Sequence, residues 1–353
     1  MKKERLHQLT APLMAWYDVH KRTLPWRGTK DPYRVWLSEI MLQQTRVGAV
    51  MGYYERFLAA CPTVFDLAAL DTDALYKLWE GLGYYSRARN LKRAAQVIAS
   101  EYGGEFPASF EELKKLPGIG DYTAAAIASI AFGEAQPAVD GNLLRVSARV
   151  AGIRKPVTDA SVKKEIRAAL CEAMDAERPG EYNQAMMDLG ATVCLPNGAP
   201  LCEKCPARAF CEAYREDLTQ VLPLRSEKKK RRGEEKTVFL ILREGKIALH
   251  KRAEKGLLAS LWEFPNVEGN LDEASAELAL AQLGFRAKTI EPLSSAKHIF
   301  THVEWQMKGY LCAVEGENED FVFADTALFE ECAIPSAFRA FVPRAREVLG
   351  GKQ

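Results

Sequence analysis

Residues 116–133 read LPGIGDYTAAAIASIAFG, and this stretch decides how the first part of the chain folds. The segment EELKKL before it and the Ala-rich segment after it have helical character, and Pro117, Gly118 and Gly120 separate them. Glycines permit a sharp turn and let a ligand approach the backbone closely. The free N–H groups at the start of the second helix favour a phosphate. The stretch therefore predicts either a phosphate-binding hairpin between two helices or an ordinary helical corner without a ligand.

The rest of the chain shows two hydrophobic patterns, one typical of helices and one typical of strands. Residues 5–220 carry apolar side chains at helical spacing with short Pro- and Gly-containing breaks. Residues 237–252 and 298–314 are strand-like, with a turn near Gly245, and ASAELALAQLG (274–284) is typical of a helix with a Gly cap. We therefore expect a mainly α protein, with a helical domain at 1–220, a basic linker at 221–235 and a smaller α+β domain at 236–353.

Composition gives few further constraints. No stretch approaches the roughly 20 apolar residues that span a bilayer, and the polar N-terminus lacks a signal sequence, which predicts a cytoplasmic protein without a membrane partner. The formal net charge is only +1, so charge alone does not predict a nucleic-acid partner. Residues 221–232 (VLPLRSEKKKRR) hold six Lys/Arg and one Glu, which suits either a solvated linker or a segment lying against phosphates.

Half of the eight cysteines crowd into one short segment, as Cys194-x7-Cys202-x2-Cys205-x5-Cys211. In a reducing compartment such a cluster favours metal over disulfides. Four thiolates suit Zn²⁺ or an iron–sulfur cubane, and a single CxxC pair does not match a zinc ribbon. The other four cysteines are scattered and are predicted to be buried free thiols: Cys61, Cys171, Cys312 and Cys332.

Two carboxylates stand in contrasting settings. Glu39 lies among apolar residues in YRVWLSEIMLQQT (33–45), where desolvation would favour the protonated form of a general acid. Asp140 lies at the expected N-cap of a helix in PAVDGNLLRVSARV (137–150), which favours its ionised form. Such a pair suits cleavage of an N-glycosidic bond. Alternatively, Asp140 is only a cap and Glu39 only a helix residue.

Six segments of the first domain together resemble the MutY adenine glycosylases of the endonuclease III superfamily. They are PWR (25–27), SEIMLQQTRV (38–47), GLGYYSRARNL (81–91), LPGIGDYTAAAI (116–127), VDGNLLRV (139–146) and NQAMMDLGATVC (183–194). The cysteine array resembles the [4Fe–4S] loop of the same superfamily, with seven residues in the first gap where six are usual.

The resemblance implies a role for individual residues. Glu39 protonates adenine, Asp140 stabilises the sugar cation ionically or covalently, and Tyr122 and Asn142 flank them. The adenine pocket is implied to comprise Trp26, Arg27, Leu42, Gln184 and Met187. Gln44 and Tyr84 wedge into the duplex, Gly118 and Gly120 shape the DNA-binding hairpin, and the cluster ligands are Cys194, Cys202, Cys205 and Cys211. Strand-cleaving relatives carry a lysine where this chain has Tyr122, which implies a monofunctional glycosylase.

The second domain resembles a Nudix fold at GLLASLWEFPNVE (256–268). The helix ASAELALAQLGF has one Glu, too few for a catalytic Mg²⁺ site. The resemblance instead implies a module that recognises 8-oxoguanine through Phe300, Thr301 and His302, with Thr301 where Ser is usual.

The resulting prediction is a monomeric enzyme of base excision repair, associated with the nucleoid through its DNA. Its substrate is adenine mispaired with 8-oxoguanine or guanine in duplex DNA, its product is an abasic site and its cofactor is a [4Fe–4S] cluster. Three alternatives remain at this point: a bifunctional glycosylase/lyase for oxidised pyrimidines, a non-enzymatic iron–sulfur DNA-binding or redox-sensing protein, and a Nudix hydrolase fused to a DNA-binding domain.

Overall fold

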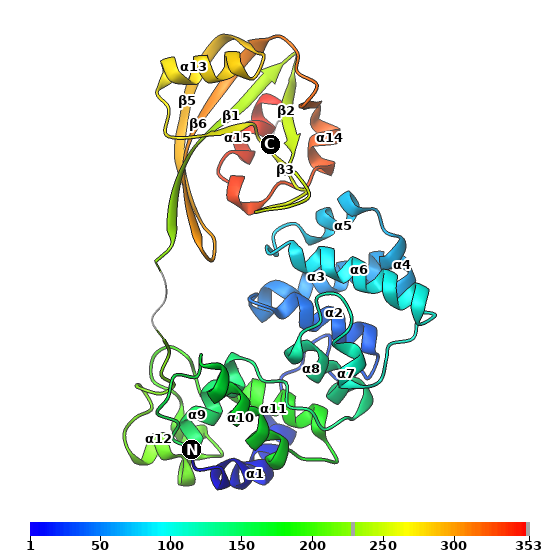
Figure 1. Ribbon diagram of the computed structural model, residues 1–353, viewed down its shortest axis with the longest axis vertical. Helices are drawn as coiled ribbons and strands as arrows, with labels where there is room; N and C mark the ends of the chain where they lie inside the picture. The colour runs from blue at the N-terminus through cyan, green and yellow to red at the C-terminus, as the bar shows by residue number, and fades with distance from the viewer. Residues whose placement is uncertain (227–229, 351–353) are drawn as a thin grey trace. The chain divides into compact units, whose positions relative to one another are not determined.

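The computed structural model describes residues 1–226 and 230–350, which form two compact units (Figure 1). The first unit comprises residues 1–70 and 89–227, and the second comprises 71–88 and 228–353. Part of the basic run 221–232 lies outside the described residues, so its expected contact with phosphates stays a prediction.

The first unit is helical. Its elements are α1 (Glu4–His20), α2 (Pro32–Leu42), α3 (Val47–Ala60), α4 (Val64–Ala69), α7 (Phe110–Leu113), α8 (Asp121–Phe132), α9 (Gly141–Val150), α10 (Ala160–Ala173), α11 (Pro179–Thr192), α12 (Glu212–Arg215) and the 3₁₀ turns η1 (Cys202–Lys204) and η2 (Arg208–Phe210). Helix α6 (Ser86–Glu101) begins in the residues of the second unit and ends in those of the first.

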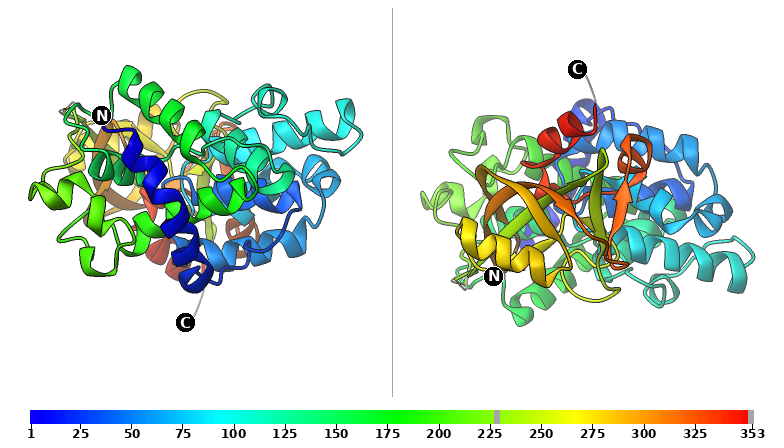
Figure 2. Two further views of the ribbon diagram at one scale, coloured as in Figure 1. Left: turned by 90° about the horizontal axis from the view of Figure 1, so that it is seen from below. Right: turned by 90° about the horizontal axis from the view of Figure 1, so that it is seen from above.

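The helices that carry the predicted site residues form one packed group. Helix α8 packs against α2 and α11, and α11 also packs against α1 and α9. Figure 2 shows α1 in dark blue across this unit. Helix α2 begins at Pro32 because Asp31 accepts a hydrogen bond from the Tyr33 amide at 2.9 Å and Pro suits the first helical position. Most of α2 is buried, so it carries Glu39 into the interior.

The turn between α7 and α8 has the predicted hairpin form. Gly118 adopts φ +75°, and a Cβ there would lie 2.5 Å from the Cβ of Asn90. Only glycine satisfies both the backbone angle and the close approach. Gly120 is the N-cap of α8 without a side-chain cap, and Gly133 at φ +73° ends that helix.

The second unit is built on a mixed sheet. Its strands are β1 (Arg232–Arg243), β2 (Lys246–Lys251), β3 (Trp262–Glu263), β4 (Asn266–Glu268), β5 (Arg286–Ile299), β6 (Val303–Glu315) and β7 (Val322–Ala324). Its helices are α5 (Thr72–Trp79), α13 (Glu273–Gln282), α14 (Thr326–Glu331), α15 (Val342–Val348) and the 3₁₀ turn η3 (Ser336–Phe338).

The strand order is β3-β2-β1-β6-β5, with β1 and β6 parallel and the other pairs antiparallel. Alternate residues of β1 face two separate cores. Phe239 and Ile241 pack with α13, and Val238 and Leu240 pack with α14 and α15 (Figure 1). The sheet is thus covered by helices on both faces, and the predicted fold class, a helical domain plus a smaller Nudix-like α+β domain, is confirmed.

Details of the second unit refine the sequence predictions. Glu244 and Gly245 both have positive φ at the β1–β2 turn, and Gly284 at φ +83° follows α13 as its cap. Strand β1 begins at Arg232, within the segment expected to be linker. Helix α13 begins at Glu273 and carries two glutamates, Glu273 and Glu277, so the prediction of one Glu was wrong because it started the helix too late.

Among the described residues, no helix has the length and apolar character that a membrane span requires.

Candidate active site and cysteine cavity

Glu39 lies in the interior of the first unit, on α2, and is 5% exposed. The Tyr122 hydroxyl donates a hydrogen bond to its Oε2 atom at 2.5 Å. Burial raises the pKa of Glu39, against the opposite effects of this hydrogen bond and of the Arg27 guanidinium. Burial also raises the pKa of Tyr122 well above its usual value, so the phenol stays a donor. The predicted desolvation of Glu39 is confirmed.

Asp140 is the N-cap of α9, as predicted. Its Oδ1 atom accepts hydrogen bonds from the backbone N–H groups of Asn142 and Leu143, each at 2.8 Å, and its Oδ2 atom accepts one from Nδ2 of Asn142 at 2.7 Å. Burial nevertheless raises the pKa of Asp140 above its ordinary value, and these donors only partly offset the rise. The N–H groups at the helix end favour the ionised form, as predicted, but the prediction left out burial, which outweighs them.

Arg27 belongs to a hydrogen-bonded cluster that the sequence did not predict. It donates to the Tyr17 hydroxyl at 3.1 Å and to Oδ1 of Asp188 at 2.9 Å. Tyr17 in turn donates to Oε1 of Gln184 at 2.7 Å. Asp188 also binds Arg22 and is fully buried, so Arg27 is held in place by a paired carboxylate. An acid within the apolar segment NQAMMDLG was the available signal for Asp188, and nothing in the sequence singled out Tyr17.

The other predicted pocket residues are also in the first unit. Trp26 is 4% exposed and packs edge-on against Tyr54. Met187 is 9% exposed, and its sulfur lies 3.9 Å from the Tyr122 hydroxyl. Leu42 is half-buried at the end of α2.

Gln44 and Tyr84, the predicted wedge residues, share an unusual backbone. Gln44 has φ +57° and Tyr84 has φ +49°, and both side chains are exposed. Left-handed backbone at a residue other than glycine is strained and concentrates at functional sites. Glu244 in the β1–β2 turn has the same left-handed backbone, so the wedge roles of Gln44 and Tyr84 stay predictions.

Phe300, Thr301 and His302 form the turn between β5 and β6 in the second unit. Phe300 packs edge-on against Trp305, with ring centroids 4.8 Å apart, which anchors the turn. Thr301 and His302 are exposed, and the Thr301 hydroxyl lies 3.3 Å from the Tyr84 hydroxyl within this unit. The β5–β6 turn is therefore held by an aromatic contact and exposes the polar side chains of Thr301 and His302.

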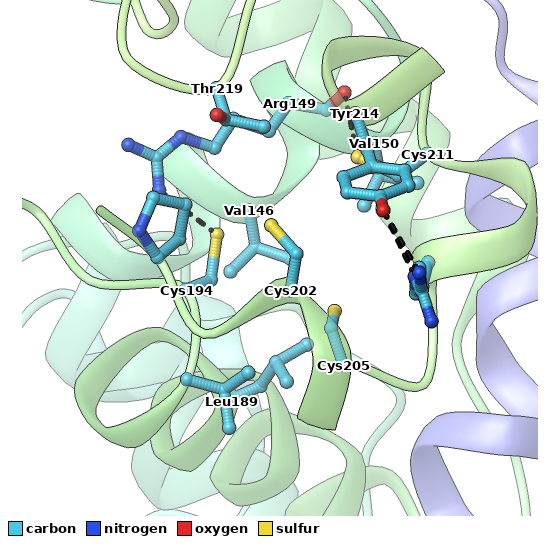
Figure 3. A pocket seen from close by; sticks show the side chains of 13 residues that line it. Val146, Arg149, Val150, Leu189, Cys194, Cys202, Cys205, Cys211, Tyr214 and Thr219 are labelled. Carbon is cyan, nitrogen blue, oxygen red and sulfur yellow. Dashed lines mark hydrogen bonds between the residues drawn. The ribbon is translucent and has the colours of Figure 1, made fainter. Parts of the chain in front are cut away.

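Cys194, Cys202, Cys205 and Cys211 line a single cavity (Figure 3). Burial raises the pKa of Cys205 to about 12 and that of Cys211 to about 11. Such buried thiols ionise when a metal displaces their protons. In the described part of the chain, no group of three or more His, Cys, Asp or Glu side chains is arranged to hold a metal ion.

Two buried arginines on α9 connect this cavity to the catalytic candidates, and the sequence analysis missed both. Arg145 donates to the side-chain oxygen of Asn142 and to the carbonyl oxygen of Cys194, each at 2.8 Å. Arg149 donates to Sγ of Cys194 at 3.2 Å. Their spacing of one helical turn in VDGNLLRVSARV was a signal, because charges at i and i+4 share a helix face.

Comparison with known proteins places both units in described families. Residues 37–171 match the model of the HhH-GPD superfamily base excision DNA repair proteins, and residues 237–344 match a NUDIX domain model. Solved structures similar to the chain include a thermostable thymine-DNA glycosylase at 28% identity and a TM-score of 0.55, covering 60% of this chain and 98% of that one. A trapped endonuclease III–DNA covalent intermediate matches at 25% identity and a TM-score of 0.53, covering 62% and 99%.

Curated relatives match over both units. The adenine DNA glycosylase of Homo sapiens is 36% identical over 366 residues, covering 87% of this chain and 67% of the human protein. The adenine DNA glycosylase of Buchnera aphidicola (subsp. Schizaphis graminum) is 35% identical over 258 residues, covering 72% and 74%. At this identity over most of both chains, the protein is a member of the adenine DNA glycosylase family.

Proposed function

We propose that this enzyme hydrolyses the N-glycosidic bond of adenine mispaired with 8-oxoguanine or guanine in duplex DNA and leaves an abasic site. The observation that carries the proposal is a pair of carboxyl groups, the buried Glu39 with a phenol donor and the half-buried Asp140 with three N–H donors. Asp140 accepts three hydrogen bonds and Glu39 accepts one, and hydrogen bonds to a carboxylate favour its charged form, so we assign the proton to Glu39 and the charge to Asp140.

The proposed reaction follows from this assignment of the proton to Glu39 and the charge to Asp140. Glu39 gives its proton to N7 of the flipped adenine, and the C1′–N9 bond breaks as the base leaves. The Asp140 carboxylate stabilises the cationic sugar, while Glu39, now ionised, takes a proton from the attacking water. Tyr122 fixes the orientation of the Glu39 carboxyl, and Asn142 fixes that of Asp140.

Base flipping requires phosphate contacts, a wedge and a pocket. The backbone N–H groups at the start of α8, beside Gly118 and Gly120, supply a phosphate contact. Gln44 and Tyr84 wedge into the duplex, and Trp26, Arg27, Leu42, Gln184 and Met187 receive the adenine. The Arg27–Asp188 ion pair supports this pocket by holding the guanidinium in place.

The four cysteines fit an iron–sulfur cluster better than a single zinc ion. All four thiols line one cavity, and an array with a single CxxC pair does not match the two pairs of a zinc ribbon. We assign Cys194, Cys202, Cys205 and Cys211 as ligands of a [4Fe–4S] cluster. It would supply structural cross-linking of the 194–211 loop, and no step of the reaction passes through it.

Recognition of the opposite base belongs to the second unit. Phe300 anchors the β5–β6 turn, and the exposed Thr301 and His302 side chains can hydrogen-bond to an oxidised purine. Helix α13 carries only two glutamates, which supports a binding role over phosphohydrolase activity.

Single-turnover base release tests the proposal with three end-labelled duplexes. They contain adenine opposite 8-oxoguanine, adenine opposite guanine, and an oxidised pyrimidine opposite guanine, each analysed with and without alkali. We expect breaks at adenine only after alkali, fastest opposite 8-oxoguanine. Breaks without alkali at the oxidised pyrimidine would indicate a glycosylase/lyase, and no cleavage by protein with a full complement of iron would indicate a binding protein.

A further inference from the structure

A cavity of about 560 Å³ opens into the first unit. It lies between the end of α1, the loop that follows it, the C-terminal end of α8 and the N-terminal end of α11. Its volume is within the range of small-molecule sites, roughly 300–1,000 Å³. The residues that line this cavity do not include Glu39, Tyr122 or Asp140.

Two residues of the proposed adenine pocket form a wall of this cavity. Arg27 and Gln184 both line it, together with Tyr17, which bridges them through its hydroxyl. The Arg27 guanidinium also lowers the pKa of Glu39 and of Tyr122 electrostatically. Arg27 therefore belongs both to the lining of the cavity and to the electrostatic surroundings of the acid.

The reaction creates a need for a second opening. Adenine enters its pocket while attached to the duplex, and after the bond breaks, the abasic sugar and its flanking phosphates still occupy that entrance. The free base then either waits for the DNA to dissociate or leaves by another route. We propose, on the basis of the function proposed above, that this cavity is the exit for free adenine, with Tyr17 and Gln184 as its gate.

The hydrogen bonds at the wall suit a gate of this kind. The bond between Tyr17 and Gln184 is neutral, whereas Arg27 is held by a charge-assisted bond to the buried Asp188. Neutral bonds are weaker than charge-assisted ones. The Arg27 guanidinium also donates to the Tyr17 hydroxyl at 3.1 Å, so Gln184 is the side chain that can move away while Tyr17 stays bound to Arg27. Beyond the gate the lining mixes Leu24 and Ile130 with charged side chains, which suits an uncharged base with a polar edge.

The test blocks the cavity and leaves the catalytic residues untouched. Thr23 and Ile130 line the cavity on different segments, so Thr23→Trp and Ile130→Trp are two independent plugs. Val19→Trp on α1 is the matched control, because Val19 is 77% exposed and does not line the cavity. A single-turnover reaction uses a duplex with radiolabelled adenine opposite 8-oxoguanine. Alkali-dependent strand breaks measure excision, and rapid filtration of free adenine measures release.

We expect both plugs to excise at the wild-type rate and to slow adenine release by about tenfold or more, with Val19→Trp unchanged in both. The assignment of the cavity as an exit would be refuted by two plugged variants that release adenine as fast as they excise it. Slower excision in the plugged variants would refute it too, because the cavity would then take part in the chemical step. Failure of wild-type protein to excise adenine would refute the proposed function instead. Thermal melting of each variant identifies a plug that disturbs folding, and the other plug then decides the test.

Discussion

The Tyr122 hydroxyl donates a 2.5 Å hydrogen bond to Oε2 of Glu39. Tyr122 stands at the second residue of α8, immediately after the hairpin, and Glu39 stands near the end of α2. The packing of α2 against α8 brings the two side chains together. In the proposed reaction this contact orients the acid.

Replacing Glu39 with Gln should abolish most excision. The amide keeps the shape of the side chain but cannot transfer a proton, and general acids contribute about 10²–10⁴-fold to rate. Single-turnover rates and duplex affinity measured on the same protein check this, with affinity expected to stay near that of the wild type. Ser38→Ala is the control, because Ser38 is a buried neighbour that bonds only its own helix at Val35. Retention of full activity by Glu39→Gln would refute the acid assignment.

The pH dependence should report the protonation of Glu39. Activity requires the protonated acid, so the rate falls as pH rises through its pKa, which burial places above the ordinary value. The Tyr122 hydrogen bond stabilises the ionised form and lowers this pKa. Tyr122→Phe should therefore move the alkaline limb of the single-turnover pH profile to higher pH. A limb that stays in place or moves to lower pH would show that it belongs to another group.

Loss of the Arg145 guanidinium should destabilise the first unit. Arg145→Leu leaves the buried carbonyl groups of Cys194 and Gly190 without their donor, which should cost on the order of 3 kcal/mol of unfolding free energy. Denaturant unfolding measures it. Arg154→Leu is the control, because its ion pair with Glu216 is exposed and such pairs contribute about 1 kcal/mol or less. Equal stability of the two variants would contradict the structural role of Arg145.

Removing one predicted cluster ligand should lower the bound iron. Cys205→Ser replaces a half-buried thiol of the cavity. Cys171→Ser replaces a thiol on α10 that is exposed, so the prediction that Cys171 is buried was wrong. Purified protein of each variant is analysed for iron and acid-labile sulfide. We expect a loss of both in Cys205→Ser alone. Full iron and sulfide in Cys205→Ser would remove that residue from the ligand set.

Thr301→Ala should weaken the preference for 8-oxoguanine over guanine. The loss of one hydroxyl hydrogen bond, about 1 kcal/mol, corresponds to roughly a fivefold change in the ratio of rates on the two duplexes. The exposed Thr289→Ala on β5 is the matched control. An unchanged ratio would assign recognition to His302 or to a residue outside this turn.

Much of the fold could be predicted because it rests on local signals. The Pro117–Gly120 turn, the N-cap Asp140 and the Gly284 cap depend on backbone angles and neighbouring N–H groups, which short sequences specify. The start of α13 and the extent of β1 were missed because element boundaries depend on packing that the local pattern does not carry.

The candidate site, too, could be predicted from the sequence only in part. Its residue types and the cysteine spacing were readable from the sequence, and so was the burial of Glu39 among apolar neighbours. The direction of the pKa shift of Asp140, the Tyr17–Arg27–Asp188 cluster and the path through Arg145 to Cys194 were not. These depend on contacts between residues tens to more than a hundred positions apart.

The sequence by itself determined the family and the helical and sheet-containing halves of the chain, because these follow from motifs, side-chain type and periodicity. Only the tertiary structure decided which groups are desolvated, which donors meet which carboxylates, and that Arg27 and Gln184 line a cavity of the first unit. Burial and hydrogen-bond geometry arise when helices pack, so no local pattern of residues encodes them.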